Sequence, residues 1–323
     1  MTSIPVLIFA ASLDYLIGDP ESWLHPVQVI GWLISYLTKF SLKISCDRSA
    51  IQRLLGSILG IIIIFGSGII SWLVIETAAS IHLLLGITLQ IILLASCFAL
   101  KSLRAACDNV VQPLIIGNIS QARSNLSKYV GRDTDNLSES EILRAVLETV
   151  TENATDGVMA PLFYAIIGCF VPFIGPVPFA VAYKASSTLD SMVGYREAPY
   201  THIGWFSARL EDYLTWIPCR LTVITLALLS RKPQRVWQIC CQDAVKDPSP
   251  NSGWSECAYA AILGVQMGGT NWYRGVAKHK PLLGKSIYPI TTDSLAQALQ
   301  ITRFCFLLWL GGGTSLLFFA LGK

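Results

Sequence analysis

A row of charged residues at four-residue spacing is the part of this sequence most suited to chemistry. The row comprises Arg144, Glu148, Glu152 and Asp156, with Asn153 beside it. An α-helix would align such side chains along one face. Carboxylate and amide oxygens are ligands that Mg²⁺ prefers, often shared with substrate phosphates. The row therefore predicts a site for Mg²⁺ and a phosphate-bearing substrate, and a solvated helix face stabilised by Arg144 is the alternative.

Other polar segments could bind phosphate or an amine. Lys184 and Arg196 flank Asp190 in a segment of small and apolar residues. The cations suit phosphate, and the carboxylate suits a metal or an amine. Arg209 and Asp212 are separated by three residues, which a helix ion pair explains equally well.

Two more segments carry candidate binding residues. Ser249 and Asn251 precede a predicted helix start, where backbone N–H groups could bind an anion or the side chains could simply cap the helix. Asp14, Asp19 and His25 lie near the N-terminus, and Asp14 is unusual because it interrupts an apolar segment.

The charged row needs a helix to position it, and the sequence supplies one. Ser138 followed by Glu141 is a capping-box pattern. Apolar residues then recur at helical spacing from Ile142 to Val150. Gly157 is the predicted end of this helix, and Gly194 the predicted end of the helix that carries Lys184 and Asp190.

Composition predicts that these helices belong to a membrane protein. Of the 323 residues, 53% are hydrophobic and only 14% are charged, whereas about 25% is usual for soluble domains. A helix needs roughly 20 apolar residues to cross a bilayer core. The sequence therefore predicts strong spans at 54–75 and 77–100. The weaker candidates are 1–17, 213–230 and 304–321.

The apolar segment 158–183 is interrupted by prolines and glycines. Pro161, Pro172, Pro176 and Pro178 fall within it, and proline removes a backbone donor and breaks helices. We expect a broken or re-entrant helical hairpin, with a single kinked span as the alternative. The predicted fold class is therefore all-α: one polytopic membrane domain, 1–323, with cytoplasmic helical segments.

Basic residues predict the orientation. Lys and Arg gather in 39–53 and in the segment that follows residue 100, while the turn expected around Glu76 has neither. The polar segments 101–157 and 231–303 are therefore expected in the cytoplasm and Glu76 on the opposite side. A net charge of +3 is too small to indicate a nucleic-acid partner, and nine scattered cysteines indicate neither a zinc site nor disulfides.

Several blocks together resemble the adenosylcobinamide-phosphate synthase family of cobalamin biosynthesis. They are GDP and HPV within Gly18 to Val27, VGRDT from Val130, ETVTENATDG from Glu148, APLFY from Ala160, AYKASSTLDSMVGYR from Ala182, ARL with the following D, IP and RL from Ala208 to Leu221, and PSPNSG from Pro248. They occur in the family's order and span nearly the whole chain.

The resemblance implies a multi-pass enzyme of the bacterial inner membrane. It would join adenosylcobyric acid to aminopropanol phosphate, or to aminopropanol, as an amide, with its active segments facing the cytoplasm. ATP and Mg²⁺ are the implied cofactors, because a carboxylate must be activated before it forms an amide in water. The lipid bilayer and other corrinoid-assembly enzymes are the expected partners.

The resemblance also suggests roles for the candidate residues. Glu148, Glu152 and Asp156 would bind Mg²⁺ with ATP or orient the amine, Asn153 would hydrogen-bond the reacting amide, and Asp190 would act as a base or metal ligand. The residues expected to bind substrate or phosphate are Arg132, Asp133, Lys184, Tyr195, Arg196, Arg209, Asp212, Ser249, Asn251, Asp14, Asp19 and His25.

Two other classes of function remain open at this stage. A membrane transporter of a small anionic or corrinoid substrate would also use broken helices with buried carboxylates, although no inverted repeat is evident. A non-catalytic scaffold for corrinoid-assembly enzymes would leave the charged row without a purpose. Only an enzyme would change the mass of its substrate, so a mass measurement distinguishes an enzyme from a transporter and from a scaffold.

Overall fold

The computed structural model describes residues 3–18, 25–45 and 48–321. The described chain is mainly α-helical, with one small two-stranded sheet, so the predicted helical fold is confirmed. The chain divides into two compact units where the sequence predicted a single domain. Unit 1 comprises Met1–Lys101, Ala160–Thr215 and Leu308–Lys323, and unit 2 comprises Ser102–Met159 and Trp216–Leu307.

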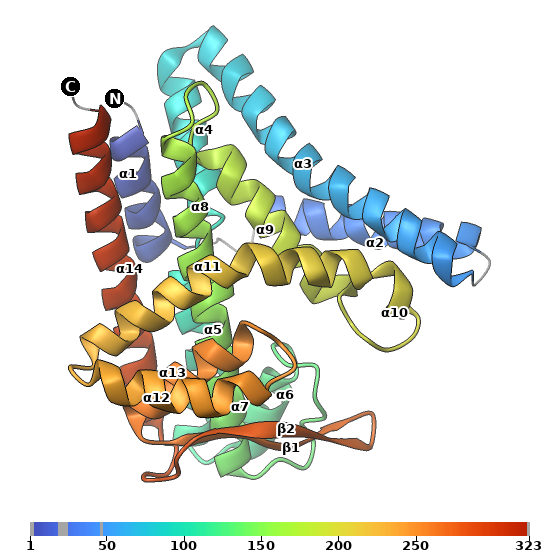
Figure 1. Ribbon diagram of the computed structural model, residues 1–323, viewed down its shortest axis with the longest axis vertical. Helices are drawn as coiled ribbons and strands as arrows, with labels where there is room; N and C mark the ends of the chain where they lie inside the picture. Colours follow the sequence, from blue (N-terminus) through green and yellow to red (C-terminus); the bar gives the residue numbers. More distant parts are fainter. Residues whose placement is uncertain (1–2, 19–24, 46–47, 322–323) are drawn as a thin grey trace. The chain divides into compact units, whose positions relative to one another are not determined.

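Unit 1 consists of apolar helices (Figure 1). They are α1 (Ser3–Leu16), α2 (Pro26–Ser45), α3 (Ser49–Ile81), α4 (Leu83–Ala95), α8 (Ala160–Cys169), α9 (Pro176–Val193), α10 (Tyr200–Ile203), the first part of α11 (Trp205–Leu229) and the last part of α14 (Thr292–Leu321). Helix α3 packs against α2, α4 and α9. Its glycines allow close approach: a Cβ at Gly56 would lie 2.0 Å from the carbonyl oxygen of Ile203.

Four described helices are long and apolar enough to span a membrane, which identifies a membrane protein. These candidate spans are Ser49–Ile81, Leu83–Ile115, Trp205–Leu229 and Thr292–Ala320. Two of the weaker predictions, 213–230 and 304–321, correspond to α11 and α14, which begin earlier in the chain than predicted. Helix α1, by contrast, is a shorter apolar helix of 14 residues.

The turn between the first two candidate spans lies at His82, six residues beyond the predicted position around Glu76. His82 has an extended backbone, with φ of −158°, and its side chain accepts a hydrogen bond from the N–H of Leu84 at 3.2 Å. Capping of α4 by this side chain fixes where α3 ends. Apolar residues on both sides of the turn concealed it in the sequence.

The predicted break in the segment 158–183 is confirmed. Helix α8 ends at Cys169 and α9 begins at Pro176, with prolines within the first turn of α9. Gly175 between them has φ of 81°, a conformation that glycine adopts readily. The two helices pack against each other within unit 1. The predicted stop at Gly194 is also confirmed as the C-cap of α9.

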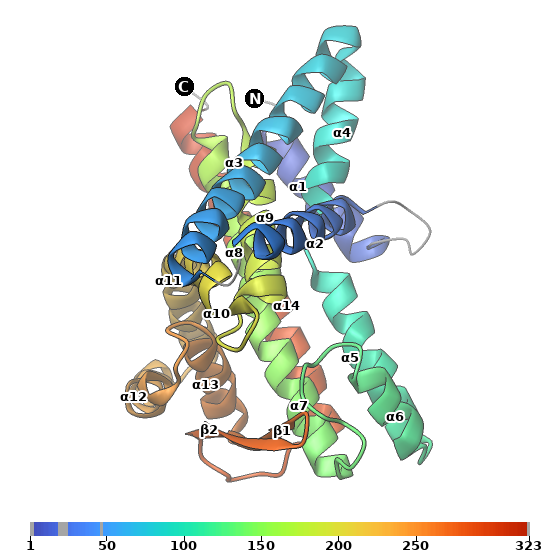
Figure 2. The ribbon, with the colours of Figure 1, turned by 90° about the vertical axis from the view of Figure 1, so that its right-hand side faces the viewer.

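Unit 2 contains the polar helices and the sheet (Figure 2). Its elements are α5 (Leu100–Ile115, from Ser102 onward), α6 (Ile119–Leu126), α7 (Glu139–Asn153), the π-helix η1 (Ala154–Met159), α12 (Pro233–Asp243), the 3₁₀ turn η2 (Ala244–Lys246), α13 (Ser252–Leu263), β1 (Gln266–Tyr273), β2 (Val276–Gly284) and the remaining parts of α11 and α14. Helix α13 packs against α7, α12 and both strands.

Helix α7 begins at the predicted capping box, but it does not end where predicted. Both hydrogen bonds of the Ser138–Glu141 capping box are present. Gly157 does not stop the helix, because the chain continues through the π-helix η1. A π turn adds a residue to each hydrogen-bonded ring and changes which side chains share a face. The four-residue spacing therefore does not extend as a regular α-helical stripe to Asp156.

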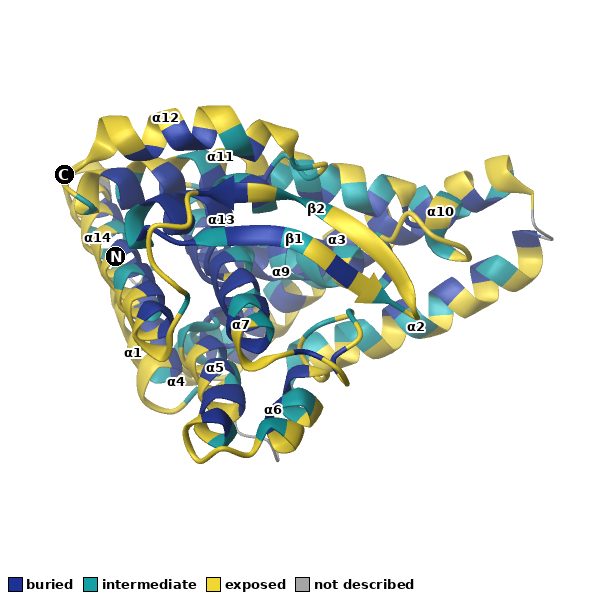
Figure 3. Cartoon of the chain, turned by 90° about the horizontal axis from the view of Figure 1, so that it is seen from below, coloured by how far each residue is buried: buried dark blue, intermediate teal, exposed yellow. Residues whose placement is uncertain are grey.

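The antiparallel hairpin β1–β2 was not predicted from the sequence. Its tip is a two-residue turn at Arg274 and Gly275, both with positive φ, of the kind that hairpins favour. Near its other end the register shifts between Met267 and Gly269. Only glycine fits between them, because a Cβ at Gly268 would lie 2.0 Å from the carbonyl oxygen of Pro281. Figure 3 shows buried residues at the base of the hairpin and exposed residues toward its tip.

Candidate functional site

Glu148, in the middle of α7, is held by two arginines and one backbone amide. Its Oε2 accepts a hydrogen bond from Arg132 Nη2 at 2.5 Å, and its Oε1 accepts one from Arg144 Nη1 at 2.9 Å. Oε1 also accepts the N–H of Gly268 at 2.8 Å. The carboxylate is 2% exposed. A buried carboxylate requires such compensation, and here both oxygens have charged donors.

Both arginines are themselves fixed by strand β1. Arg132 and Arg144 donate to the Oδ1 of Asn271, at 2.9 and 3.0 Å, and Arg144 also donates to the carbonyl of Gly268 at 2.7 Å. Burial alone would raise the pKa of Glu148, but Arg132 and Arg144 outweigh it, and the pKa is lowered. Glu148 is therefore an ionised anchor between α7 and the hairpin.

A second buried cluster surrounds Lys280 on β2. The Lys280 ammonium donates to Glu256 Oε1 at 2.6 Å and lies 4.0 Å from Asp247 Oδ2. Glu256 is fully buried and Asp247 is 3% exposed. Glu256 Oε2 and Asp247 Oδ2 accept no hydrogen bond from any described residue. One ammonium thus lies between two buried carboxylates, and two of their oxygens accept no hydrogen bond from the described residues.

The electrostatics of this cluster favour a retained proton. Burial raises the pKa of Glu256 to about 8, although Lys280 opposes the rise and Glu152 and Glu148 add to it. Burial also raises the pKa of Glu152, with Lys280 opposing and Asp247 adding to the rise. For Lys280 burial lowers the pKa, but Glu256 and Glu152 outweigh burial and the net shift is upward. The carboxyl group of Glu256 can therefore exchange a proton near neutral pH, and the pKa of Glu152 is shifted in the same direction.

Hydroxyl groups connect this cluster to the start of the π-helix. Ser255, next to Glu256 on α13, donates to the carbonyl of Thr151 at 2.6 Å and bonds the hydroxyl of Thr155 at 2.8 Å. In a regular α-helix the amide of residue 155 would donate to this carbonyl. Ser255 thus binds α7 at the point where its hydrogen-bonding pattern changes, as is common for π turns at functional sites.

Comparisons with known proteins place the chain in a family. The family model described as CobD/Cbib protein matches residues 7–302. The chain belongs to the CobD/CbiB family. It is 53% identical over 307 residues to the cobalamin biosynthesis protein CobD of Synechocystis sp., covering 95% of this chain and 90% of that one. The resemblance stated from the motifs is confirmed.

More distant relatives carry the same kinds of name. The cobalamin biosynthesis protein CobD of Halalkalibacterium halodurans is 38% identical over 317 residues, covering 95% of this chain and 96% of that one. The cobalamin biosynthesis protein CbiB of Salmonella typhimurium is 36% identical over 293 residues, covering 90% and 89%. No solved structure matches the chain. Membership of the CobD/CbiB family supports a role in cobalamin biosynthesis.

Within this CobD/CbiB chain, the structure brings some of the predicted residues together. Arg132 contacts Glu148 directly, and Glu152 shares its electrostatic environment with Glu148 and Lys280. Asn153 is exposed, and its side chain donates to the carbonyl of Thr149, one turn earlier in its own helix. Asn153 therefore binds its own backbone rather than either cluster.

Asp133 binds the backbone at the tip of the hairpin. Its two carboxylate oxygens accept the backbone N–H groups of Arg274 at 2.9 Å and Gly275 at 2.7 Å. These two bonds lower the pKa of Asp133. The carboxylate therefore closes the hairpin tip.

The predicted anion site before α13 is filled by the chain's own side chains. The Ser249 hydroxyl accepts the N–H groups of Asn251 and Ser252, at 3.3 and 3.1 Å. Asn251 is buried, and its Oδ1 accepts a hydrogen bond from Arg220. Ser249 thus binds the backbone just before and at the start of α13, whereas the N-cap residue Asn251 makes no side-chain capping hydrogen bond. Arg220, which the sequence analysis did not single out, also lies 4.3 Å from the ring centroid of Trp254.

The N-terminal candidates in unit 1 have structural partners. Asp14 is buried, and its Oδ2 accepts the N–H of Leu100, the first residue of α5, at 3.1 Å. Lys101 donates to the carbonyls of Leu16 and Ile17, at the end of α1. The Nδ1 of His25 accepts the N–H of Val27 at 3.2 Å, at the start of α2. Asp19 lies outside the described residues.

The remaining candidates also belong to unit 1. Lys184 and Asp190 lie on α9, and the side chain of Asp190 folds over Gly194, where a Cβ would lie 2.0 Å from its Oδ1. Arg196 and Arg209 both act electrostatically on Asp212, which agrees with the predicted helix pairing of Arg209. The candidate Tyr195 is half exposed, with its ring centroid 6.0 Å from that of Tyr200.

The described carboxylates of unit 2 do not form a magnesium site made by protein side chains alone. Among the described residues, no three His, Cys, Asp or Glu side chains are grouped so as to hold a metal ion. Glu148, the first residue of the predicted trio, already accepts three hydrogen bonds. The arrangement of Glu148, Glu152 and Asp156 therefore does not fit Mg²⁺ held by these three carboxylates.

Sequence reasoning missed the two residues at the centre of the second cluster. Glu256 is a single carboxylate in a helix of small residues, between Ser255 and Cys257, and that isolation was the available signal. Lys280 gave no signal, because only the hairpin brings it to α13. The pair is separated by 24 residues in the sequence.

Proposed function

We propose that this CobD/CbiB family member forms an amide bond between the carboxylate of adenosylcobyric acid and the amine of aminopropanol phosphate, or of aminopropanol, with the consumption of ATP. The relatives' names support the pathway, and the motifs that resemble adenosylcobinamide-phosphate synthases support the reaction. When bound, ATP would supply the activation that a carboxylate needs before an amine can displace its oxygen.

The observation that carries the proposal is the carboxylate cluster around Lys280. An amine is protonated near neutral pH and must lose its proton as the carbon–nitrogen bond forms. Glu152 and Glu256 have raised pKa values, so each carboxylate accepts a proton more readily than an ordinary glutamate does. Glu152 is half-buried, whereas Glu256 is fully buried, so we assign contact with the amine to Glu152.

The other members of the cluster would position this base. Lys280 stabilises Glu256 in its ionised form and holds it through a hydrogen bond of 2.6 Å. A proton taken by Glu152 would be felt within the Lys280 cluster, since the charge of Glu152 raises the pKa of Glu256. Glu148, already neutralised by two arginines, would keep α7 and the hairpin in place. We assign no step to Mg²⁺.

The decisive assay follows the mass of the corrinoid. Purified protein in detergent would be incubated with adenosylcobyric acid, aminopropanol phosphate, Mg²⁺ and ATP, and we expect a mass gain that matches amide formation, with stoichiometric ATP hydrolysis. Parallel reactions with aminopropanol identify the preferred amine. Corrinoid binding without a mass change would contradict the enzyme and favour the transporter or scaffold.

We also propose that the protein lies in the bacterial inner membrane with the basic segments around residues 39–53 and after residue 100 in the cytoplasm. The turn at His82 would then face the opposite side. A reporter enzyme fused after Ala78 should be active only outside the cytoplasm, and one fused after Ser124 only inside it. The reverse pattern would contradict this topology.

A further inference from the structure

Unit 2 contains a pocket of about 280 Å³ at the C-terminal end of α13. The residues just before and within the start of α12, the last turn of α13 and the segment after β2 line it. Lys232 and Arg235 supply the charge, and apolar residues including Leu263 and Ile287 line the rest of the pocket. None of these residues belongs to the Lys280 cluster.

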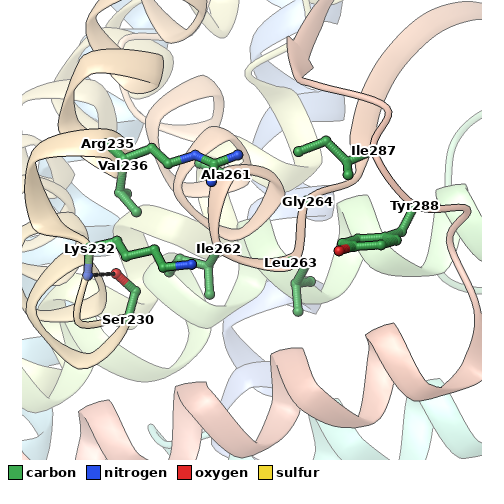
Figure 4. A pocket seen from close by; sticks show the side chains of 10 residues that line it. All are labelled: Ser230, Lys232, Arg235, Val236, Ala261, Ile262, Leu263, Gly264, Ile287 and Tyr288. Carbon is green, nitrogen blue, oxygen red and sulfur yellow. Dashed lines mark hydrogen bonds between the residues drawn. The ribbon is translucent and has the colours of Figure 1, made fainter.

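Three polar groups converge on this space. Figure 4 shows the Lys232 ammonium, the Arg235 guanidinium and the Tyr288 hydroxyl pointing toward the same region. The structure gives these three side-chain groups no hydrogen bond or ion pair with any residue it describes. The pocket therefore presents two positive charges and a hydroxyl donor beside an apolar wall.

The backbone holds the tyrosine in this position. Gly264 has φ of 69° and ends α13 as its C-cap. Its carbonyl accepts the N–H groups of both Ile287, at 3.0 Å, and Tyr288, at 2.9 Å. A Cβ at Gly264 would lie 3.0 Å from the Tyr288 ring. The absence of that Cβ lets the ring lie close to the helix end.

We propose that this pocket binds the phosphate group of an organic phosphate ester. Two cations and a hydroxyl match the several acceptor oxygens of a phosphate, whereas a single arginine fork would be enough for a carboxylate. The apolar wall would contact the organic part of the ester. Basic side chains also neutralise the C-terminal end of a helix dipole, but that role does not require Tyr288.

The phosphate could come from a lipid headgroup or from a soluble ester. Ser230, which lines the pocket, directly follows the candidate span Trp205–Leu229, a position typical of lipid headgroups. A soluble phosphate ester would use the same donors. The proposal does not depend on the reaction proposed above, because the two sites have no residue in common.

Two binding measurements on the delipidated full-length protein in dodecyl maltoside test the proposal. Calorimetry would follow titration with glycerol 3-phosphate at constant ionic strength. Native mass spectrometry would count molecules of phosphatidylglycerol retained by the same preparation. Each would be repeated with the double variant Lys232→Gln/Arg235→Gln and with Tyr288→Phe.

The matched control is the double variant Arg231→Gln/Lys285→Gln, which removes the same charge from exposed residues that do not line the pocket. Losing two charged donors should weaken binding about tenfold or more, and losing the hydroxyl alone about threefold, with the control within about twofold of the native protein. Binding of either probe with this pattern supports the pocket, and the probe bound identifies the source. Absence of binding for both probes, or an equal loss in the control, would overturn the proposal.

Discussion

Glu148 and Glu256 are both buried glutamates of unit 2, but their environments give them opposite properties. Glu148 accepts hydrogen bonds from two arginines and a backbone amide, and its pKa is lowered. Glu256 accepts one from Lys280, keeps one oxygen without a donor, and has its pKa raised to about 8. The number of donors, rather than burial itself, separates a structural carboxylate from one able to exchange a proton.

The largest effect is expected when Glu148, whose two carboxylate oxygens both accept hydrogen bonds, is replaced. Glu148→Ala would leave Arg132 and Arg144 buried without their partner, which should lower the free energy of unfolding by about 3–5 kcal/mol. Thermal unfolding in detergent measures this loss. Glu139→Gln, an exposed carboxylate at the start of the same helix, is the matched control. Equal stability of the two variants would show that Glu148 is not an anchor.

The next effect concerns activity rather than stability. Glu152→Gln and Glu256→Gln should reduce the rate of amide formation by about 10²- to 10⁴-fold, as expected when an acid–base group is lost. Membrane insertion and the unfolding temperature should remain near those of the native protein. Asp135→Asn, at an exposed residue, controls for charge. Full turnover by Glu152→Gln would refute its role as the base.

A smaller and more diagnostic effect is the dependence of stability on pH. The folded-state pKa of Glu256 is above its ordinary value of 4.5, so the folded protein binds an extra proton between about pH 4.5 and 8. Its contribution to stability is therefore fully present below pH 4.5 and is lost as the pH rises toward 8. Unfolding titrations should show this slope in the native protein and a reduced slope in Glu256→Gln.

Glu148 should give the opposite sign. Its pKa is lowered in the folded state, so its contribution is present above pH 4.5 and is lost as the pH falls below that value. An acid-side loss of stability that persists in Glu256→Gln would confirm that the two carboxylates act separately. If the Glu256→Gln variant lost both the acid-side and the neutral-side change of stability with pH, the two carboxylates would not act separately.

The smallest effect is expected at the hairpin tip. Asp133→Asn weakens the acceptors for the N–H groups of Arg274 and Gly275. These two amides should exchange hydrogen faster, while the unfolding midpoint changes little, because the tip is exposed. Exchange at the base of the hairpin, near Gly268, serves as the internal control. Unchanged exchange at the tip would show that Asp133 does not close the turn.

What the sequence could predict is set by distance along the chain. The Ser138–Glu141 capping box and the Arg144–Glu148 ion pair involve neighbours on one helix, so spacing alone identified them. The break at 158–183 was visible because proline and glycine act locally. Family motifs identified the pathway because several blocks occurred in order.

The missed features depend on tertiary contacts. Lys280 meets Glu256 only because the β1–β2 hairpin folds onto α13, and periodicity cannot show that pairing. The π-helix after Asn153 is equally hidden, because Ser255 stabilises it from another helix. Asp133 shows the same dependence, because its partners Arg274 and Gly275 are about 140 residues away in the sequence.

The paired contacts of Asp14 and Lys101 have a consequence for biosynthesis. Asp14 caps the start of α5, and Lys101 binds the end of α1, so each helix completes the other. A ribosome makes Asp14 some 86 residues before its partner Leu100. Helix α1 is therefore synthesised before the amide of Leu100, and the three helices α2, α3 and α4 are made in between. We expect proteolysis to cleave α1 more readily in nascent chains arrested before Leu100 has emerged from the ribosome. Chains arrested shortly after Leu100 has emerged should be cleaved less readily there.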